Sequence, residues 1–110
     1  MNLPEEGMLL RIFIGESDKY KGKALYEQIV IKARELNLAG ATVIRGIMGF
    51  GAHSRIHTAK LLALSEDMPV VVEIVDTEEK LNSLLPFLDE IMKDGIITLE
   101  KARVIRYRHG

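Results

Sequence analysis

The sequence predicts an α+β domain in which two helices cover one face of a four-stranded antiparallel sheet. Three observations indicate this class. Four short segments are rich in β-branched and other apolar residues, two longer segments repeat apolar residues at helical spacing, and each longer segment lies between two of the short ones. A chain of 110 residues is expected to form one domain, which spans residues 1–110.

The first predicted strand covers residues 8–15 and is apolar on both faces. Its alternating sets are Met8, Leu10, Ile12 and Ile14 on one face, and Leu9, Arg11 and Phe13 on the other. The polar residues 16–23 are predicted to form a loop. The first helix is expected from about Lys23 to Leu38, because apolar residues recur there at helical spacing, and Gly40 ends it.

The second strand is predicted over residues 41–48, where β-branched residues are frequent. It runs into Gly46, Gly49 and Gly51, where the chain must bend or approach another group closely. Residues 53–64 are predicted to form an additional short helix.

The third strand is expected over residues 68–75. A second helix follows over residues 76–92, with Asp76 as the residue that caps its first N–H groups. Pro86 lies in the middle of this segment and should kink or split the helix. The last strand is predicted over residues 96–107.

This order of elements indicates a ferredoxin-like β-α-β-β-α-β sandwich, with the extra short helix between the second and third strands. Two helices cover only one face of the sheet, whereas the first and third strands are apolar on both faces. The second face is therefore expected to be buried in a homo-oligomer.

The composition excludes several classes of protein. Cysteine is absent, which excludes disulfides, thiolate zinc sites, iron–sulfur clusters and a cysteine nucleophile. The 15 basic and 16 acidic side chains give a formal charge of −1, which argues against a nucleic-acid binder. The first residues lack the pattern of a secretory signal, and the apolar runs are too short to span a bilayer. We therefore expect a cytoplasmic protein without direct membrane insertion.

The charge is unevenly distributed along the chain. Residues 1–65 carry +3, residues 66–94 carry −7 and residues 95–110 carry +3. Arg106 and Arg108 are two positions apart on the last predicted strand, so they are expected to share a face on which two guanidinium groups can bind a phosphate. A solvated strand end, or a salt bridge to the acidic middle of a neighbouring chain, is the alternative.

Four segments carry a resemblance to a known family. They are RGIMGFGAHS at residues 45–54, VVVEIVD at residues 70–76, the Asp94-Gly95 turn, and VIRYRHG at residues 104–110. Together they resemble the PII signalling proteins, and more closely a PII-like family with the motif Arg-Gly-x-x-Gly-Phe-Gly. The similarity covers nearly the whole chain from Met8 onward.

The resemblance implies a homotrimer that binds an adenine nucleotide, ADP or AMP, in clefts between its subunits. In PII proteins the Gly-Phe-Gly element lines the nucleotide, while the turn before the last strand (here Asp94-Gly95) and basic residues on that strand hold the phosphates. The nucleotide-binding residues expected from this are Arg45, Gly49, Phe50, Gly51, His53, Ser54, Gly95, Arg106 and Arg108.

The implied role is regulation, without catalysis and without an obligatory cofactor. By analogy with PII proteins, the regulated partner is expected to be a membrane transporter or another protein, and residues 52–65 would report the nucleotide by moving. This segment is shorter and more helix-prone than the PII loop and has no tyrosine, and the phosphate turn keeps only Gly95. These departures favour a monophosphate or diphosphate over a magnesium-bound triphosphate.

The glycine cluster and the arginines near it each have an alternative interpretation that involves no ligand. By spacing alone, the three glycines between residues 46 and 51 fit a bulge or strand bend better than a ligand site, and only the resemblance reverses this preference. Arg45 is either a third phosphate contact or an ion pair at a subunit interface, and Arg55 has the same two interpretations.

His53 and His57 are four residues apart, which is the spacing of two metal-binding histidines on a helix. Ser54 stands where a zinc-protease motif needs a glutamate, so histidines that contact the nucleotide are preferred. The alternative function is a structural or divalent-metal-binding trimer similar to the CutA proteins, which share the fold. An enzyme is the last choice, because the sequence has neither a Gly-x-Ser-x-Gly elbow nor a P-loop motif.

Overall fold

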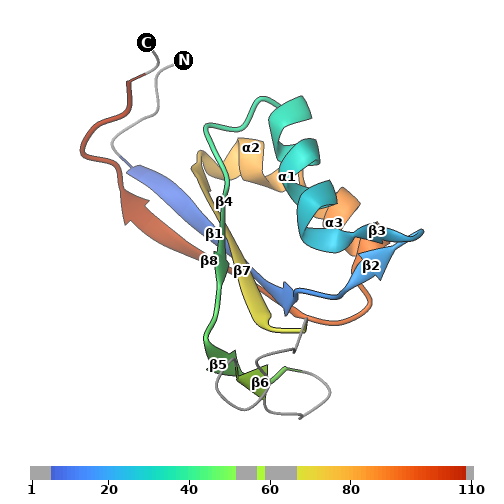
Figure 1. The fold of residues 1–110 in the computed structure, drawn as a ribbon. Coiled ribbons are helices and arrows are strands. Elements are labelled where there is room, and N and C mark those ends of the chain that lie inside the picture. Colours follow the sequence, from blue (N-terminus) through green and yellow to red (C-terminus); the bar gives the residue numbers. More distant parts are fainter. Residues whose placement is uncertain (1–5, 52–56, 59–66, 109–110) are drawn as a thin grey trace.

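The computed structural model describes residues 6–51, 57–58 and 67–108, and its main feature is a four-stranded sheet with the order β4-β7-β1-β8 (Figure 1). The elements are β1 (Glu6–Gly15), β2 (Lys19–Tyr20), β3 (Lys23–Ala24), α1 (Leu25–Glu35), β4 (Thr42–Arg45), β5 (Met48–Gly49), β6 (His57–Thr58), β7 (Pro69–Asp76), α2 (Glu78–Asn82), α3 (Leu85–Ile91) and β8 (Ile96–Arg103). Neighbouring strands of this sheet are antiparallel throughout, and β1 and β7 lie in its centre. The predicted ferredoxin-like arrangement is confirmed.

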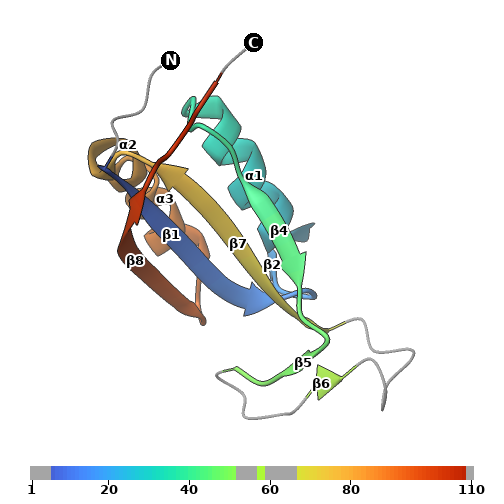
Figure 2. The same cartoon turned by 90° about the vertical axis from the view of Figure 1, so that its left-hand side faces the viewer.

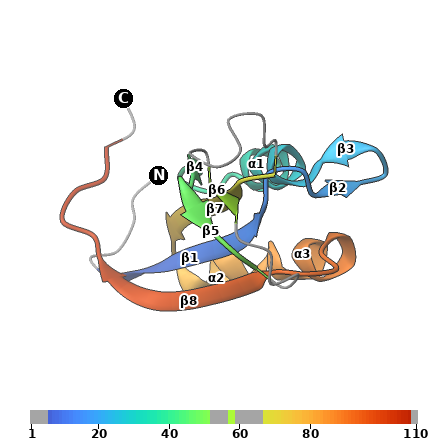
Figure 3. The same cartoon turned by 60° about the horizontal axis from the view of Figure 1, so that its bottom comes forward.

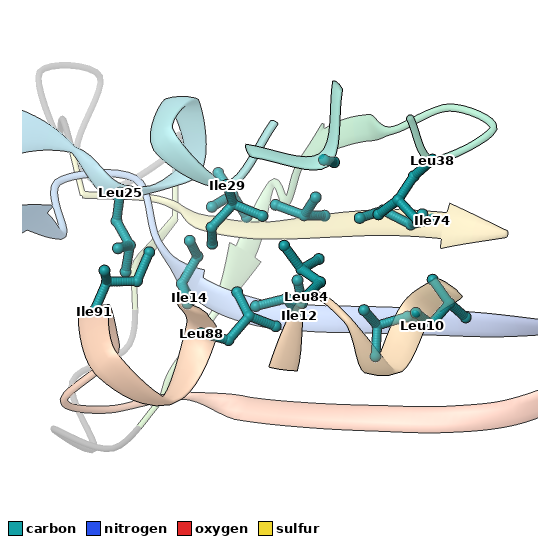
Figure 4. Packing of buried hydrophobic residues seen from close by; sticks show 14 residues of the cluster. Leu10, Ile12, Ile14, Leu25, Ile29, Leu38, Ile74, Leu84, Leu88 and Ile91 are labelled. Carbon is teal, nitrogen blue, oxygen red and sulfur yellow. The ribbon is translucent and has the colours of Figure 1, made fainter. Parts of the chain in front are cut away.

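The helices lie together on one face of the sheet, and Figure 2 shows them behind it. Alternate residues of the two central strands point toward the helices, because successive side chains of a strand face opposite ways. The resulting core packs these strand residues against α1, α2 and α3 (Figure 4); its members include Leu10, Ile12, Ile14, Leu25, Ile29, Val70, Val72, Ile74, Leu84, Leu88 and Ile91. None of the described helices is long and apolar enough to cross a membrane.

Pro86 divides the second predicted helix, as expected, into the short helices α2 and α3. It lies in the first turn of α3, where a missing N–H removes no hydrogen bond within the helix. The predicted cap was wrong by one residue. Thr77 caps α2, because its side chain accepts a hydrogen bond from the Lys80 backbone N–H at 3.2 Å.

Asp76 ends β7 and holds two chain segments together instead of capping the helix. Its side chain is fully buried. Oδ2 accepts a hydrogen bond from the Ala39 backbone N–H at 2.8 Å, and Oδ1 accepts one from the Thr77 N–H at 2.7 Å. The carboxylate therefore joins the α1–β4 connection to the junction between β7 and α2.

Two segments differ from the predicted elements. Residues 16–23 were expected to be a loop, but residues 19–24 form the β2–β3 hairpin, whose turn residues Lys21 and Gly22 have φ angles of 53° and 81°. The short helix predicted for residues 53–64 is wrong for His57 and Thr58, which form β6 and pair with β5. Pairing with a neighbouring strand overrides the helical spacing at these two positions; the rest of that prediction lies outside the described residues.

The last strand is shorter than predicted, since β8 ends at Arg103. The predicted extension of the strand to residue 107 was wrong: Arg106 and Arg108 are exposed residues beyond β8, so strand alternation no longer supports their placement on one face. Arg103 pairs with Glu6, the first residue of β1 that the structure describes, so no described residue of β1 is left to pair with the chain beyond Arg103.

The second face of the sheet is covered by no helix in the part of the chain that the structure describes (Figure 2). We call it the open face. Its side chains include Leu9 and Phe13 of β1, Val71 and Val75 of β7, Ile44 of β4 and Ile96 of β8. Three of these, Phe13, Ile44 and Ile96, are exposed. A mostly apolar face that the helices leave uncovered is what the apolar pattern of the strands predicted.

Candidate functional site

A cavity of about 460 Å³ lies at the end of the sheet where β1 ends and β7 and β8 begin. Figure 3 shows this end, with β5 and β6 beside it. The cavity is lined by Phe13, Ile14, Gly15, Asp18, Gly49, Phe50, Gly51, Asp67, Pro69, Val70, Val71, Asp94, Gly95 and Ile96. It therefore brings together the Gly-Phe-Gly element and the Asp94-Gly95 turn, which are more than forty positions apart in the sequence.

The cavity has an apolar wall formed by three neighbouring strands. Phe13 of β1 is the register partner of both Val71 of β7 and Ile96 of β8, so the three side chains form a row across the open face. Three strands at their usual spacing give a row about 10 Å wide. Phe50 is 68% exposed and also lines the cavity. Such a wall with an exposed aromatic ring suits a flat heterocycle.

Two of the three glycines have a packing explanation. A Cβ at Gly46 would lie 2.9 Å from Pro69 Cγ, and a Cβ at Gly49 would lie 3.2 Å from the same atom. The Gly46 N–H also donates a hydrogen bond to the Pro69 carbonyl at 2.6 Å. The close approach of this segment to Pro69 therefore requires small residues at positions 46 and 49. This agrees with the interpretation of these glycines as a strand bend.

Gly51 differs from both. A Cβ there would meet nothing within 4 Å, and its φ does not lie in the left-handed region. Neither packing nor backbone conformation within the described chain requires a glycine at this cavity-lining position.

Gly95 has a structural requirement as well as a place in the cavity wall. Its φ is 123°, and a Cβ would lie 2.7 Å from the Phe13 carbonyl oxygen and 2.9 Å from Met92 Cε. Only glycine satisfies both the backbone conformation and this close approach. The turn before β8 is therefore tight for reasons that do not depend on a ligand.

Two carboxylates that the sequence reasoning missed line the same cavity. Both Asp67 and Asp18 lie against Gly15: a Cβ there would be 2.7 Å from Asp67 Oδ1 and 3.1 Å from Asp18 Oδ1. Asp67 accepts a hydrogen bond from the Ser17 N–H at 3.2 Å, and Asp18 accepts one from the Gly15 N–H at 2.9 Å. No motif marked either residue, because the fold alone brings the two loops together; the nearest signal was the strand end at Gly15.

Several predicted site residues do not line the cavity. Arg45 lies at the end of β4, where its Nε donates to Glu16 Oε1 at 3.0 Å. Arg106 and Arg108 belong to the segment that follows β8, and since the eight residues of β8 span about 25 Å, this segment leaves the sheet at the end opposite the cavity (Figure 1). His53 and Ser54, like Arg55, lie outside the described residues. In β6, His57 pairs with Gly49 through the backbone.

The charged residues that line the cavity are Asp18, Asp67 and Asp94. Within the described ranges, no group of three or more His, Asp or Glu side chains is arranged to hold a metal ion. A phosphorylated ligand would therefore need its cationic contacts from outside this set of lining residues.

Next to the cavity, the open face carries a charged cluster of Arg11, Glu73 and Glu100. Arg11 Nε donates to Glu73 Oε2 at 3.0 Å, and its guanidinium also bonds Glu100. The hydrogen bond to Glu73, together with the charges of both carboxylates, raises the pKa of Arg11 against the opposing effect of burial. Arg11 therefore stays protonated at all ordinary pH values.

Comparison with known proteins identifies relatives at the level of family and fold. The model of the DUF190 family, described as "Uncharacterized ACR", matches residues 7–104. A UPF0166 protein of Aquifex aeolicus is 46% identical over 99 residues, covering 88% of this chain and 91% of that protein.

Two solved structures share the fold at low sequence identity. CPII, a nitrogen regulatory PII-like protein from Thiomonas intermedia K12 bound to ADP, AMP and bicarbonate, matches with a TM-score of 0.65 and 19% identity, covering 92% of this chain and 90% of that one. The divalent ion tolerance protein CutA1 of Ehrlichia chaffeensis matches with a TM-score of 0.54 and 11% identity, covering 93% and 84%. The chain belongs to the DUF190 (UPF0166) family and has the fold of the PII-like proteins.

Proposed function

We propose that this protein is a cytoplasmic, non-catalytic regulatory module that binds an adenine nucleotide, ADP or AMP, in clefts between the subunits of a homotrimer. The observation that carries the proposal is the cavity at the end of the sheet. It gathers Gly49, Phe50, Gly51 and Gly95, which the resemblance to PII-like proteins had singled out, around an apolar wall of suitable width for a purine. The similar fold of a PII-like protein bound to ADP and AMP supports the same ligand class.

In the proposed trimer, the neighbouring subunit supplies the cationic side chains that the cavity of one chain lacks. The charged residues that line the cavity are all carboxylates, whereas Arg106 and Arg108 follow the far end of β8, a strand about 25 Å long. In a closed ring of copies, a surface at one end of the chain meets the other end of its neighbour. The apolar open face gives such copies a surface to bury, and the cavity wall formed by Phe13, Val71 and Ile96 belongs to that face.

The first experiment measures binding and mass together. AMP, ADP, ATP and cyclic AMP are titrated calorimetrically into the purified protein, and light scattering gives its mass in solution. We expect micromolar binding of AMP or ADP to a trimer. A folded trimer that binds none of the four ligands would contradict the nucleotide function.

Gly51→Ala tests whether the ligand explains this glycine. We expect about tenfold weaker binding, because the added methyl group occupies space next to the ligand, and no loss of stability. Gly40→Ala is the matched control, since a Cβ at Gly40 also meets nothing within 4 Å and Gly40 does not line the cavity. Equal affinity of both variants would contradict the assigned role of Gly51.

Subunit mixing tests the intersubunit site. The double variant Arg106→Ala, Arg108→Ala and the variant Gly51→Ala each carry one defective half of the proposed site. When the two are refolded together, mixed trimers should contain some sites with both halves intact, so part of the high-affinity binding should return. No recovery in mixed trimers would place the arginines outside the nucleotide site.

The second candidate is a structural or divalent-metal-binding trimer, which the fold similarity to CutA1 favours. It predicts binding of a divalent ion that His53→Ala or His57→Ala abolishes, and no response to nucleotides. Titration of zinc and copper ions into the same preparation distinguishes it from the nucleotide function.

A further inference from the structure

Asp18 stands out among the cavity residues because, within the described part of the chain, one of its two carboxylate oxygens accepts a hydrogen bond and the other accepts none. We propose that Asp18 determines nucleotide specificity: its Oδ1 accepts a hydrogen bond from an uncharged donor on the ligand, either the amino group of the base or a ribose hydroxyl. This inference rests on the proposed nucleotide function and adds a specificity residue that neither the sequence motifs nor the family resemblance pointed to.

The position of the carboxylate is fixed by three hydrogen bonds. Oδ2 accepts the Gly15 N–H at 2.9 Å, the Asp18 N–H donates to the Gly15 carbonyl at 3.1 Å, and the Asp18 carbonyl accepts the Leu25 N–H at 2.8 Å. The last bond ties the loop to the start of α1. A half-buried side chain held in this way loses little entropy when a ligand binds.

The second oxygen is available to a ligand. Asp18 Oδ1 lies 3.1 Å from the position of a Cβ at Gly15 and accepts no hydrogen bond from the residues that the structure describes. Gly15 thus allows a charged acceptor to reach the wall of a largely apolar cavity. A half-buried acceptor of this kind is expected to find a donor in the bound state.

The chemistry of a carboxylate selects which part of the nucleotide comes near. An ionised carboxylate only accepts hydrogen bonds, so it attracts N–H and O–H groups and repels phosphate oxygens. Asp67 lies against the same glycine and adds to this repulsion. The base or the ribose, and not the phosphate, therefore faces Gly15, and the phosphate points away from this wall.

The test compares ligands of equal charge. AMP, 2′-deoxy-AMP, 3′-deoxy-AMP and IMP all carry one phosphate, and the last three each alter one group that could donate to Asp18. We expect one of the three to bind the wild-type protein at least about tenfold more weakly than AMP, since a hydrogen bond to a charged group is lost. If all three bind as tightly as AMP, no such donor is recognised and the inference is overturned.

The variant Asp18→Asn assigns the effect to this residue. Its amide oxygen can still accept the Gly15 N–H, while an NH₂ group replaces the ligand-facing oxygen. We expect AMP to bind at least about tenfold more weakly and to lose its advantage over the sensitive analogue. Asp89→Asn, with the same change of charge at an exposed position of α3, should behave as wild type.

The outcomes separate two failures. If AMP binds the wild-type protein but Asp18→Asn keeps the same preference among the four ligands, the role of Asp18 is overturned and the nucleotide function stands. If no nucleotide binds the wild-type protein, the proposed function itself fails, and the inference about Asp18 fails with it.

Discussion

The two faces of the central sheet are similar in sequence and opposite in their surroundings. On the covered face, Leu10, Ile12 and Val72 are completely buried beneath the helices. On the open face, Phe13 and Ile96 are 37% and 62% exposed, although they are equally apolar. A single chain therefore covers only one of the two apolar faces that its strands carry. In the proposed trimer, a second copy of the chain and a ligand at the end of the sheet would cover the other face.

The largest expected effect on stability is that of replacing Leu10 of β1, and its neighbour Leu9 serves for comparison. Leu10→Ala removes a completely buried side chain of the covered face and should lower the free energy of unfolding by about 2–5 kcal/mol. Leu9→Ala, on the open face, should cost about 1 kcal/mol or less in the isolated subunit. Urea denaturation at several protein concentrations measures both.

The same pair tests the proposed assembly. The loss of stability caused by Leu9→Ala should be larger when unfolding is linked to dissociation of the trimer. The unfolding midpoint of Leu9→Ala should therefore depend on protein concentration more strongly than that of Leu10→Ala. Equal effects of the two variants at every concentration would mean that the two faces are equivalent, contrary to the comparison.

A smaller effect is expected at Asp76, which closes the covered face at the end of β7. Asp76→Ala leaves the Ala39 and Thr77 N–H groups without their acceptor, so the free energy of unfolding should fall by about 1–3 kcal/mol. Asp89→Ala, at an exposed position of α3, is the control and should stay within about 0.5 kcal/mol of wild type. Thermal and urea unfolding would show no difference between the two if the buried carboxylate were dispensable.

The smallest effect on subunit stability is expected from the charged cluster of the open face. Because its partners raise the pKa of Arg11, the contribution of this residue is fully present below the pKa of the unfolded chain and is lost only as the pH rises through the higher folded value. Both values lie above the working range, so this contribution should not change between about pH 6 and about pH 9.

Salt should weaken the ion pairs of this cluster, although pH does not, because the pairs are partly exposed and therefore screened. Arg11→Gln should leave subunit unfolding nearly unchanged and weaken assembly, since Glu73 and Glu100 then repel each other at the proposed interface. Light scattering of wild type and Arg11→Gln at low and high salt checks this. Unchanged mass of the variant would place the cluster outside the interface.

Much of this organisation follows from local sequence patterns. The patterns along residues 8–15 and 68–75 predicted two strands with two apolar faces, and both strands were found, in the centre of the sheet. Pro86 predicted the break between α2 and α3, because a residue without an N–H is accommodated in the first turn of a helix and not in its interior. The motif around Phe50 and the Asp94-Gly95 turn predicted two parts of the cavity wall.

The errors have one physical cause. Helical spacing in residues 53–64 did not show that His57 would pair with Gly49, since the pairing energy comes from another segment. In the same way, alternation did not show that β8 would end at Arg103, because that end depends on the pairing with β1, whose first described residue, Glu6, is the partner of Arg103.

The sequence alone therefore determined the four strands of the main sheet, the helical segments between them, their order and the apolar open face, since hydrophobic periodicity, turns and proline act over a few neighbouring residues. Only the tertiary structure decided which residues meet. It placed Asp18 and Asp67, 49 positions apart, against the same glycine, it packed Gly46 and Gly49 against Pro69, and among the described residues it set no packing requirement at Gly51. These contacts depend on the positions of whole strands and loops, which no local pattern encodes.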